Sequence, residues 1–225
     1  MKKVVKFGGS SLASAEQFKK VGAIIKADPA RRFVVPSAPG KRYDGDTKVT
    51  DLLYACYEKA VNGEEFSDFF QKIQDRYNEI ISGLGITLSL EKEFSTIKIQ
   101  FENQAGRDYA ASRGEFLNGI VMAAYLGFES EKTDQKLKAS LEGKEHVVIP
   151  GFYGAKPDGT IQTFSRGGSD VTGSIVAKAI LADVYENWTD VSGFLVADPR
   201  IIKDSKVIET ITYRELRELS YMGAT

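Results

Sequence analysis

The stretch Lys3-Val4-Val5-Lys6-Phe7-Gly8-Gly9-Ser10-Ser11 runs from a short apolar strand directly into a glycine turn. A helix is predicted to begin just after it at Ser14, because the Ser14 hydroxyl can cap a helix and Gln17 completes a capping box. A strand that leads through a glycine turn into a helix is the repeating unit of α/β folds. The start of the chain therefore predicts an α/β architecture.

The rest of the chain keeps this alternation. Further strands are predicted at residues 32–37, 146–149, 160–164 and 184–188, with a helix over 170–181 and a last helix capped by Thr212 and Glu215. Because strands that alternate with helices pair in parallel, we expect a mainly parallel sheet with helices on both faces.

The middle of the chain, from about residue 50 to 126, is predicted to be helical. One long helix carries apolar residues at i, i+3/4 and i+7, which is typical of a helix face that packs on a core. A cofactor surface is the alternative interpretation of this aromatic stripe, and the core is favoured. The residues of the stripe are Phe66, Phe69, Phe70, Ile73, Tyr77, Ile80 and Ile81.

Composition excludes several classes of function. The 225 residues carry a net charge of −1 and no basic patch, so a nucleic-acid partner is not expected. With one cysteine, Cys56, and one histidine, His146, the chain can form neither a Cys/His zinc site nor a disulfide framework, and no protein metal site is predicted. His146 opens a predicted strand, which favours a structural or solvent role over catalysis.

The sequence shows no pattern for a membrane or for export. The N-terminal residues lead into the first strand without the layout of a signal peptide. The longest apolar run, 120–126, is far shorter than the roughly 20 residues that span a bilayer. We expect a soluble cytoplasmic protein with no membrane partner.

Two glycine turns share one pattern: a cation, paired glycines and a hydroxyl residue at a helix start. The first is Lys6-Phe7-Gly8-Gly9-Ser10-Ser11 and the second is Arg166-Gly167-Gly168-Ser169-Asp170. Glycines let backbone amides approach an anion, and helix N-termini favour negative charge. One such turn could be an ordinary loop, but two favour a phosphate-handling site. The sequence has no Walker A, Gly-x-Gly-x-x-Gly or protein-kinase signature, so another device must bind the phosphate.

Four motifs in order resemble the aspartokinases, a group within the amino acid kinase family. They are 5–11, Ser112-Arg113-Gly114-Glu115, 165–172 and the segment 188–200. The resemblance implies a three-layer αβα sandwich, the amino acid kinase fold, with a helical insertion around 50–126. It also implies ATP- and Mg²⁺-dependent phosphorylation of the side-chain carboxylate of L-aspartate to 4-phospho-L-aspartate, the first step toward lysine, threonine and methionine.

The same resemblance assigns roles around the phosphates. Lys6 is implied to neutralise the transferring group and Asp170 to orient Lys6; these two are the expected catalytic residues. The turn that follows Lys6 is implied to cradle phosphate oxygens, and a later segment is implied to lie along the nucleotide. The expected nucleotide-binding residues are Lys6, Phe7, Gly8, Gly9, Ser10, Thr189, Asp190 and Arg200.

An amino-acid acceptor needs an anion for its ammonium and a cation for its carboxylate. The resemblance implies Glu115 and Arg166 for these roles, with three residues nearby: Thr50, Phe152 and Ser169. On a helix, the neighbours of Glu115 at i±3 and i±4 are short and none is cationic, which leaves room for a ligand. They are Ala111, Ser112, Asn118 and Gly119. A solvated surface glutamate remains the alternative.

The resemblance covers the whole chain as one catalytic domain, 1–225. Its acceptor-binding part is expected at roughly 1–150 and its nucleotide-binding part at roughly 151–225. Because aspartokinases continue further, we expect an incomplete C-terminal end without the regulatory ACT domains, and homo-oligomers in the full-length protein. Two positions depart from the family: Leu195 stands where tyrosine is frequent, and Thr225 where lysine is usual.

Two alternatives stay open at this stage. One is a sister kinase that acts on glutamate, acetylglutamate or another small acceptor. The other is a module that binds a nucleotide or an amino acid without catalysis. The presence of both Lys6 and Asp170 speaks against a pure binding module, because only phosphoryl transfer needs that pair.

Overall fold

The computed structural model describes the chain except for residues 132–136, 165–166, 190, 192, 199–200 and 222–225. The described residues form two compact units, Met1–Thr189 and Asp190–Thr225, which are treated separately below. None of the helices in the described ranges is long and apolar enough to cross a membrane.

The first unit contains a five-stranded sheet with the order β3-β4-β2-β1-β7, and all four pairings are parallel. Its strands are β1 (Lys3–Phe7), β2 (Arg31–Pro36), β3 (Glu129–Ser130), β4 (Val147–Val148) and β7 (Val184–Trp188). The expected α/β class with a mainly parallel central sheet is confirmed. The predicted strand 146–149 is shorter in the structure, and β3 was not predicted.

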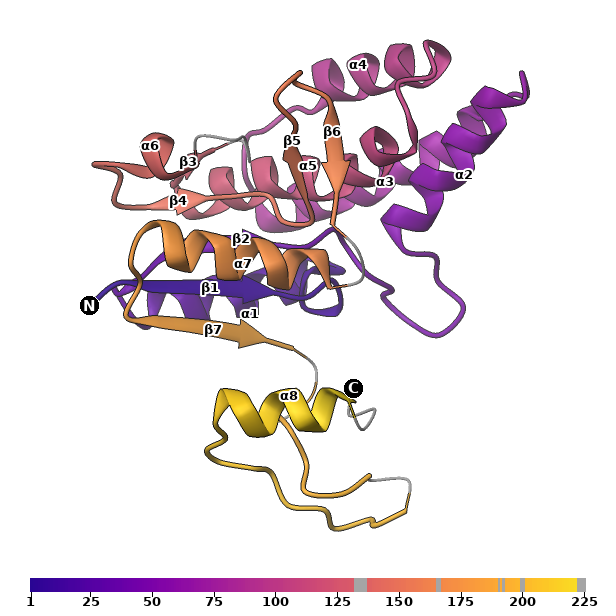
Figure 1. Cartoon of the computed structure of the whole chain (residues 1–225). Coiled ribbons are helices and arrows are strands. Elements are labelled where there is room, and N and C mark those ends of the chain that lie inside the picture. The colour runs from indigo at the N-terminus through magenta and orange to yellow at the C-terminus, as the bar shows by residue number, and fades with distance from the viewer. Residues whose placement is uncertain (132–136, 165–166, 190, 192, 199–200, 222–225) are drawn as a thin grey trace. The chain divides into compact units, whose positions relative to one another are not determined.

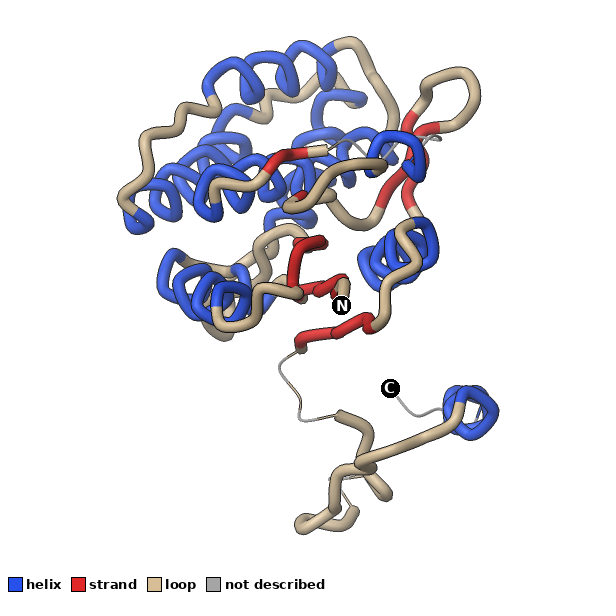
Figure 2. The backbone as a smooth tube through the Cα atoms, turned by 90° about the vertical axis from the view of Figure 1, so that its left-hand side faces the viewer, coloured by secondary structure: helices blue, strands red, loops and turns tan. Residues whose placement is uncertain are grey.

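Helices cover both faces of this sheet (Figures 1 and 2). Along a strand, successive side chains point to opposite faces. Val5 and Phe7 therefore pack with α1 (Ala15–Lys26), whereas Val4 packs on the opposite side with Val176 of α7 (Gly168–Ala179). Lys6 shares the face of Val4, so its side chain points toward α7. Helix α1 begins as predicted, because the Ser14 hydroxyl accepts a hydrogen bond from the Gln17 amide at 3.4 Å.

A layer of four helices fills the predicted helical region: α2 (Val49–Val61), α3 (Ser67–Leu84), α4 (Glu91–Glu102) and α5 (Arg107–Leu126). The aromatic stripe of the α3 region packs into the main hydrophobic core, as predicted. Phe70 makes edge-to-face contacts with Phe66, Phe94 and Phe101, at ring-centroid distances of 6.1 to 6.4 Å. These edge-to-face contacts join α3 to α4 through buried aromatic rings.

The predicted strand 160–164 lies outside the main sheet. It appears as β6 (Ile161–Thr163), which pairs antiparallel with β5 (Tyr153–Ala155) in a separate two-stranded sheet. The second glycine turn therefore follows a hairpin rather than a strand of the central sheet. It still leads into a helix, because α7 begins at Gly168. A short helix, α6 (Leu137–Leu141), comes before β4.

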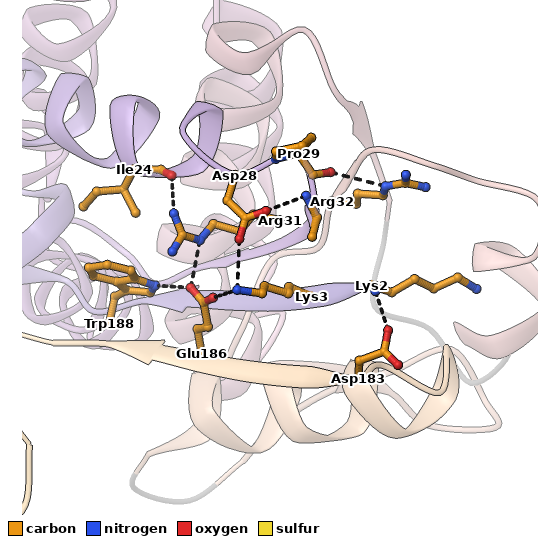
Figure 3. A network of polar contacts seen from close by, with 11 residues as sticks. Lys2, Lys3, Ile24, Asp28, Pro29, Arg31, Arg32, Asp183, Glu186 and Trp188 are labelled. Carbon is orange, nitrogen blue, oxygen red and sulfur yellow. Dashed lines mark hydrogen bonds and ion pairs between the residues drawn. The ribbon is translucent and has the colours of Figure 1, made fainter. Parts of the chain in front are cut away.

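Strand β7 is fixed to its neighbours by a network centred on Glu186 (Figure 3). One carboxylate oxygen of Glu186 lies 2.8 Å from Lys3 Nζ, and the other accepts hydrogen bonds from Arg31 Nε at 2.9 Å and Trp188 Nε1 at 2.8 Å. Burial alone would raise the Glu186 pKa, but these hydrogen bonds hold it below its usual range. The network thus ties the starts of β1 and β2 to β7.

The second unit contains an isolated antiparallel bridge between Leu195 and Val207 and then helix α8 (Tyr213–Tyr221). The predicted cap of this helix is confirmed: the Thr212 amide and hydroxyl both donate to the Glu215 carboxylate, at 2.8 and 2.7 Å, and the Glu215 amide donates back at 3.3 Å. Thr225 lies outside the described residues.

Candidate active site at the carboxyl edge of the sheet

Lys6 and Asp170 join the two glycine turns. Lys6 precedes Gly8-Gly9 on β1, and Asp170 lies in the first turn of α7, after Gly167-Gly168. The Lys6 Nζ and the Asp170 Oδ1 are 2.9 Å apart, with 10% of the lysine side chain and 42% of the aspartate side chain exposed. The sequence places these residues 164 positions apart, and the structure brings them into one ion pair.

The first turn rests on its neighbours through backbone contacts. The Gly8 amide donates to the Trp188 carbonyl at 3.2 Å, and the Gly9 carbonyl accepts from the Gly40 amide at 2.8 Å. A phosphate oxygen would therefore compete with Trp188 for the Gly8 amide. Thr189 follows Trp188 directly in the chain, so its backbone lies close to this turn in space. Ser10 begins a short 3₁₀ helix, Ser10–Leu12.

The second turn is packed against the segment before β5. Gly167 has φ +76°, which glycine adopts without strain, and α7 begins at the next residue. A Cβ built on Gly151 would lie 2.7 Å from the Ser169 hydroxyl oxygen. The Phe152 amide donates to the Thr172 hydroxyl at 3.0 Å, so Phe152 lies against the start of α7, which carries Ser169; both are predicted site residues.

Glu115 is buried on α5 with a carboxylate oxygen that has no hydrogen-bond partner among the described residues. The alternative of a solvated surface glutamate is therefore wrong. Burial raises the Glu115 pKa to about 8, and the Ala38 amide offsets only part of this rise. Thr50 lies beside the same helix turn, because a Cβ built on Gly114 would be 3.7 Å from the Thr50 hydroxyl.

Contacts link Glu115 to the two glycine turns along the carboxyl edge of the sheet. Ala38, in the loop after β2, approaches both Gly9 and Gly114, whose built Cβ atoms would lie 2.8 Å from its carbonyl oxygen and 2.7 Å from its Cβ. On the other side, Gly119 of α5 packs on Pro150, the residue before Gly151. Those predicted site residues that are described in the first unit therefore lie close together along this edge of the sheet.

Three predicted site residues lie outside the described residues: Arg166, Asp190 and Arg200. Sequence reasoning also missed the groups that hold the loop after β2. Arg76 of α3 donates to the Gly40 carbonyl at 3.0 Å and pairs with Asp46 at 2.6 Å. These contacts connect residues that are 30 and 36 positions apart, so no local pattern could reveal them.

No group of three or more His, Cys, Asp or Glu side chains within the described ranges could hold a metal ion by itself. A Mg²⁺ ion bound through substrate phosphates needs only one or two protein carboxylates. Asp170 has a carboxylate close to both turns: its Oδ1 lies 2.9 Å from Lys6 Nζ, and its Oδ2 would lie 3.5 Å from a Cβ built on Gly167.

Comparison with known proteins gives a consistent family. The profile of the amino acid kinase family matches residues 1–225. Aspartokinase 3 of Bacillus subtilis is 38% identical over 98% of this chain, and the alignment covers 56% of that protein. A crystal structure of Clostridium acetobutylicum aspartate kinase has a TM-score of 0.93 and 49% identity, over all of this chain and 56% of the other.

A second solved structure contains ligands. Escherichia coli aspartokinase III in complex with aspartate and ADP has a TM-score of 0.80 and 25% identity, over all of this chain and 57% of the other. The chain thus spans little more than half the length of these three relatives. Both solved structures align with the whole length of this chain.

Proposed function

The chain belongs to the amino acid kinase family, and from this premise we propose that the protein transfers the terminal phosphoryl group of ATP to the side-chain carboxylate of L-aspartate. The products are 4-phospho-L-aspartate and ADP, and the reaction is the first step toward lysine, threonine and methionine. The aspartokinase relatives, one solved with aspartate and ADP, support this substrate pair.

The observation that carries the proposal is the Lys6–Asp170 ion pair between two glycine turns. Phosphoryl transfer depends on positioning and on neutralising charge that spreads over the transferring group. In the proposed reaction the Lys6 ammonium supplies this positive charge, and Asp170 holds the ammonium in place. The Phe7-Gly8-Gly9-Ser10 turn binds phosphate oxygens, and Thr189, Asp190 and Arg200 contact the nucleotide.

The acceptor requires no general base. A carboxylate with a reference pKa of about 4 is already ionised at pH 7 and can attack phosphorus directly. The single histidine, His146, is not needed, and its ring packs against Phe128 with centroids 4.9 Å apart.

Recognition of the amino acid rests on opposite charges at its two ends. Glu115 binds the α-ammonium, because its buried carboxylate has an unpartnered oxygen and no cation beside it among the described residues. Arg166 binds the α-carboxylate, with Thr50, Phe152 and Ser169 lining the same site. A free amino group is required, since an acceptor without an ammonium would offer no positive charge to pair with the buried, ionised Glu115 side chain.

The bound Mg²⁺ would be held by the phosphates and by Asp170, where its charge offsets that of the phosphate oxygens. We place the acceptor-binding part of the domain at roughly 1–150 and the nucleotide-binding part at roughly 151–225. Each part also contributes to the other ligand, through the phosphate-binding turn after Lys6 and through Phe152, Arg166 and Ser169. We expect a cytoplasmic homo-oligomer.

The test is a hydroxylamine trap for acyl phosphate with the full-length protein, ATP and Mg²⁺. The acceptors are L-aspartate, L-glutamate and N-acetyl-L-glutamate, and the Lys6→Ala variant is the blank. We expect hydroxamate from L-aspartate alone and none from the variant. Product from another acceptor would replace the aspartate assignment with that of a sister kinase. Nucleotide binding without product from any acceptor would indicate a non-catalytic module.

A further inference from the structure

Helix α5 carries two buried hydrogen-bond acceptors on one face. Asn118 lies three residues after Glu115, and residues at this spacing are neighbours on the helix surface. The Asn118 side chain has no exposed surface, and 5% of Glu115 is exposed. Both side chains are therefore removed from water, so their polar atoms need partners within the protein or on a ligand.

The orientation of the Asn118 amide follows from its one hydrogen bond. Asn118 Nδ2 donates to the Ser37 carbonyl oxygen at 2.6 Å. Because a carbonyl oxygen only accepts, the amide nitrogen must face Ser37 and the amide oxygen must point elsewhere. That oxygen, Oδ1, is buried and has no hydrogen-bond partner among the described residues. The tether to Ser37 explains the nitrogen and leaves the oxygen unexplained.

Glu115, one helical turn earlier, likewise has a buried side-chain oxygen, Oε2, with no hydrogen-bond partner among the described residues. A buried acceptor without a donor costs free energy, and such groups in native proteins call for an explanation. Two unpartnered acceptors on adjacent turns of one helix face require a donor-rich group. A primary ammonium offers three N–H donors and a positive charge, whereas a carboxylate or phosphate offers none.

We propose that Asn118 Oδ1 is a second acceptor for the ammonium group of the amino-acid substrate, beside Glu115. The inference rests on the proposed function and makes Asn118 a specificity-determining residue for the free amine. Its position agrees, because Ser37 precedes Ala38 in the loop that contacts the Gly9 turn, and Gly119, the next residue on α5, packs on Pro150. In an N-acylated acceptor the nitrogen has one N–H and no positive charge, so it would be a poor partner for these two oxygen atoms.

The experiment compares ligands with and without the amino group. In the full-length protein we would measure the KM for L-aspartate, the KM for ATP and the inhibition constant of succinate, which lacks the amine. The succinate concentrations must be high enough to define its inhibition constant. We expect Asn118→Ala to weaken L-aspartate about tenfold or more, the size of a lost hydrogen bond to a charged group. Succinate and ATP should change less than threefold.

The matched control is Tyr77→Phe. The buried Tyr77 hydroxyl donates to the Gly114 carbonyl at 2.7 Å, so its loss disturbs α5 beside Glu115 without removing an acceptor for the ligand. Any effect of Tyr77→Phe should be equal for L-aspartate and succinate. Equal weakening of both ligands by Asn118→Ala, or less than threefold weakening of L-aspartate, would overturn the inference and leave Asn118 with a structural role only.

Failure of the proposed function would be recognised separately. If the wild-type protein forms no hydroxamate from L-aspartate, the proposed reaction is wrong, and Asn118 is then tested by the melting-temperature shifts that L-aspartate and L-glutamate cause. A shift that Asn118→Ala abolishes and Tyr77→Phe retains supports the ammonium contact. A shift that survives in Asn118→Ala, or no shift with either amino acid, overturns it.

Discussion

Gly9 and Gly40 touch through their backbones: the Gly40 amide donates to the Gly9 carbonyl at 2.8 Å. A Cβ built on Gly40 would lie 2.7 Å from the carbonyl carbon of Gly9 and 2.8 Å from the Ser10 nitrogen. Both of these are backbone atoms, which a rotamer change cannot move away. The loop after β2 therefore supports the phosphate turn only while residue 40 has no side chain.

We predict that Gly40→Ala displaces this turn. The protein should lose roughly 1–3 kcal/mol of stability, as for overpacked sites, and the KM for ATP should rise more than the KM for L-aspartate. Gly154→Ala is the control, since a Cβ there meets nothing within 4 Å, and its effect should stay within about 0.5 kcal/mol. Urea unfolding and steady-state kinetics measure both. Equal behaviour of the two variants would contradict the prediction.

The ion pair between Arg76 and Asp46 holds the same loop from the side of α3. Both side chains are buried, with 4% and 8% exposed, at a distance of 2.6 Å. Burial alone would raise the Asp46 pKa, but hydrogen bonds from Arg42 and the charge of Arg76 hold it well below its usual range. The carboxylate thus stays ionised at any pH of interest and needs its cation.

Arg76→Met should therefore cost roughly 3–5 kcal/mol, because it leaves a buried carboxylate without one of its cations. Lys20→Met provides the comparison: Lys20 and Glu16 also form an ion pair at 2.9 Å, but their side chains are 59% and 78% exposed. Solvent screens this surface pair, so its loss should cost much less than the loss of the buried pair. Denaturant unfolding at pH 7 measures both. A cost for Arg76→Met no larger than for Lys20→Met would show that the loop is held by other contacts.

Two adjacent aromatic residues of α3 should differ sharply in how much their replacement by alanine destabilises the protein. Phe70 is completely buried among three other phenylalanine rings, whereas Phe69 is only partly buried at the margin of the core. We predict a loss of roughly 3–5 kcal/mol for Phe70→Ala and a clearly smaller loss for Phe69→Ala, measured by thermal and urea unfolding. Similar losses would mean that the core reaches further around the helix than the structure shows.

Helical periodicity alone grouped Phe69 and Phe70 in one stripe, and only packing separates them. The same limit applies to the strands. Strands β1, β2 and β7 have five or six residues each and are long enough to be recognised, whereas β5 has three residues and pairs with its neighbour across a turn. Such a short hairpin has no distinct periodicity, so sequence reasoning assigned its second strand to the alternating sheet.

For the site, local motifs located Lys6, Glu115 and Asp170, because each stands in a recognisable turn or helix segment. Spacing also identified Asn118 as a short neighbour of Glu115, but not its unpartnered oxygen. That property depends on the contact with Ser37, 81 residues away. Arg76 carried no signal at all, since its partners lie in a loop that comes close only after folding.

Glu115 should make both stability and substrate affinity depend on pH. Its pKa is about 8 in the folded protein and near 4.5 in a solvated chain. Between these values the folded state holds a proton that the unfolded state has released, so stability falls as pH rises through this window. The Glu115 charge contributes to the raised pKa of Tyr54, Tyr77 and Tyr153, so these side chains lie near it, and a tyrosine supplies no compensating cation.

Glu115→Gln replaces the titratable carboxyl with an amide that stays neutral at every pH. In melting curves without substrate, the stability of the variant relative to wild type should therefore increase as the pH rises from 5 to 9. Binding of the ammonium favours the ionised carboxylate, so the wild-type KM for L-aspartate should fall from pH 6 to 8.5. In the variant the KM should be high and nearly independent of pH. Glu102→Gln, at an exposed position on α4, should follow wild type in both measurements. A wild-type KM that does not change with pH, together with parallel stability curves for wild type and Glu115→Gln, would mean that Glu115 is already ionised before the substrate binds.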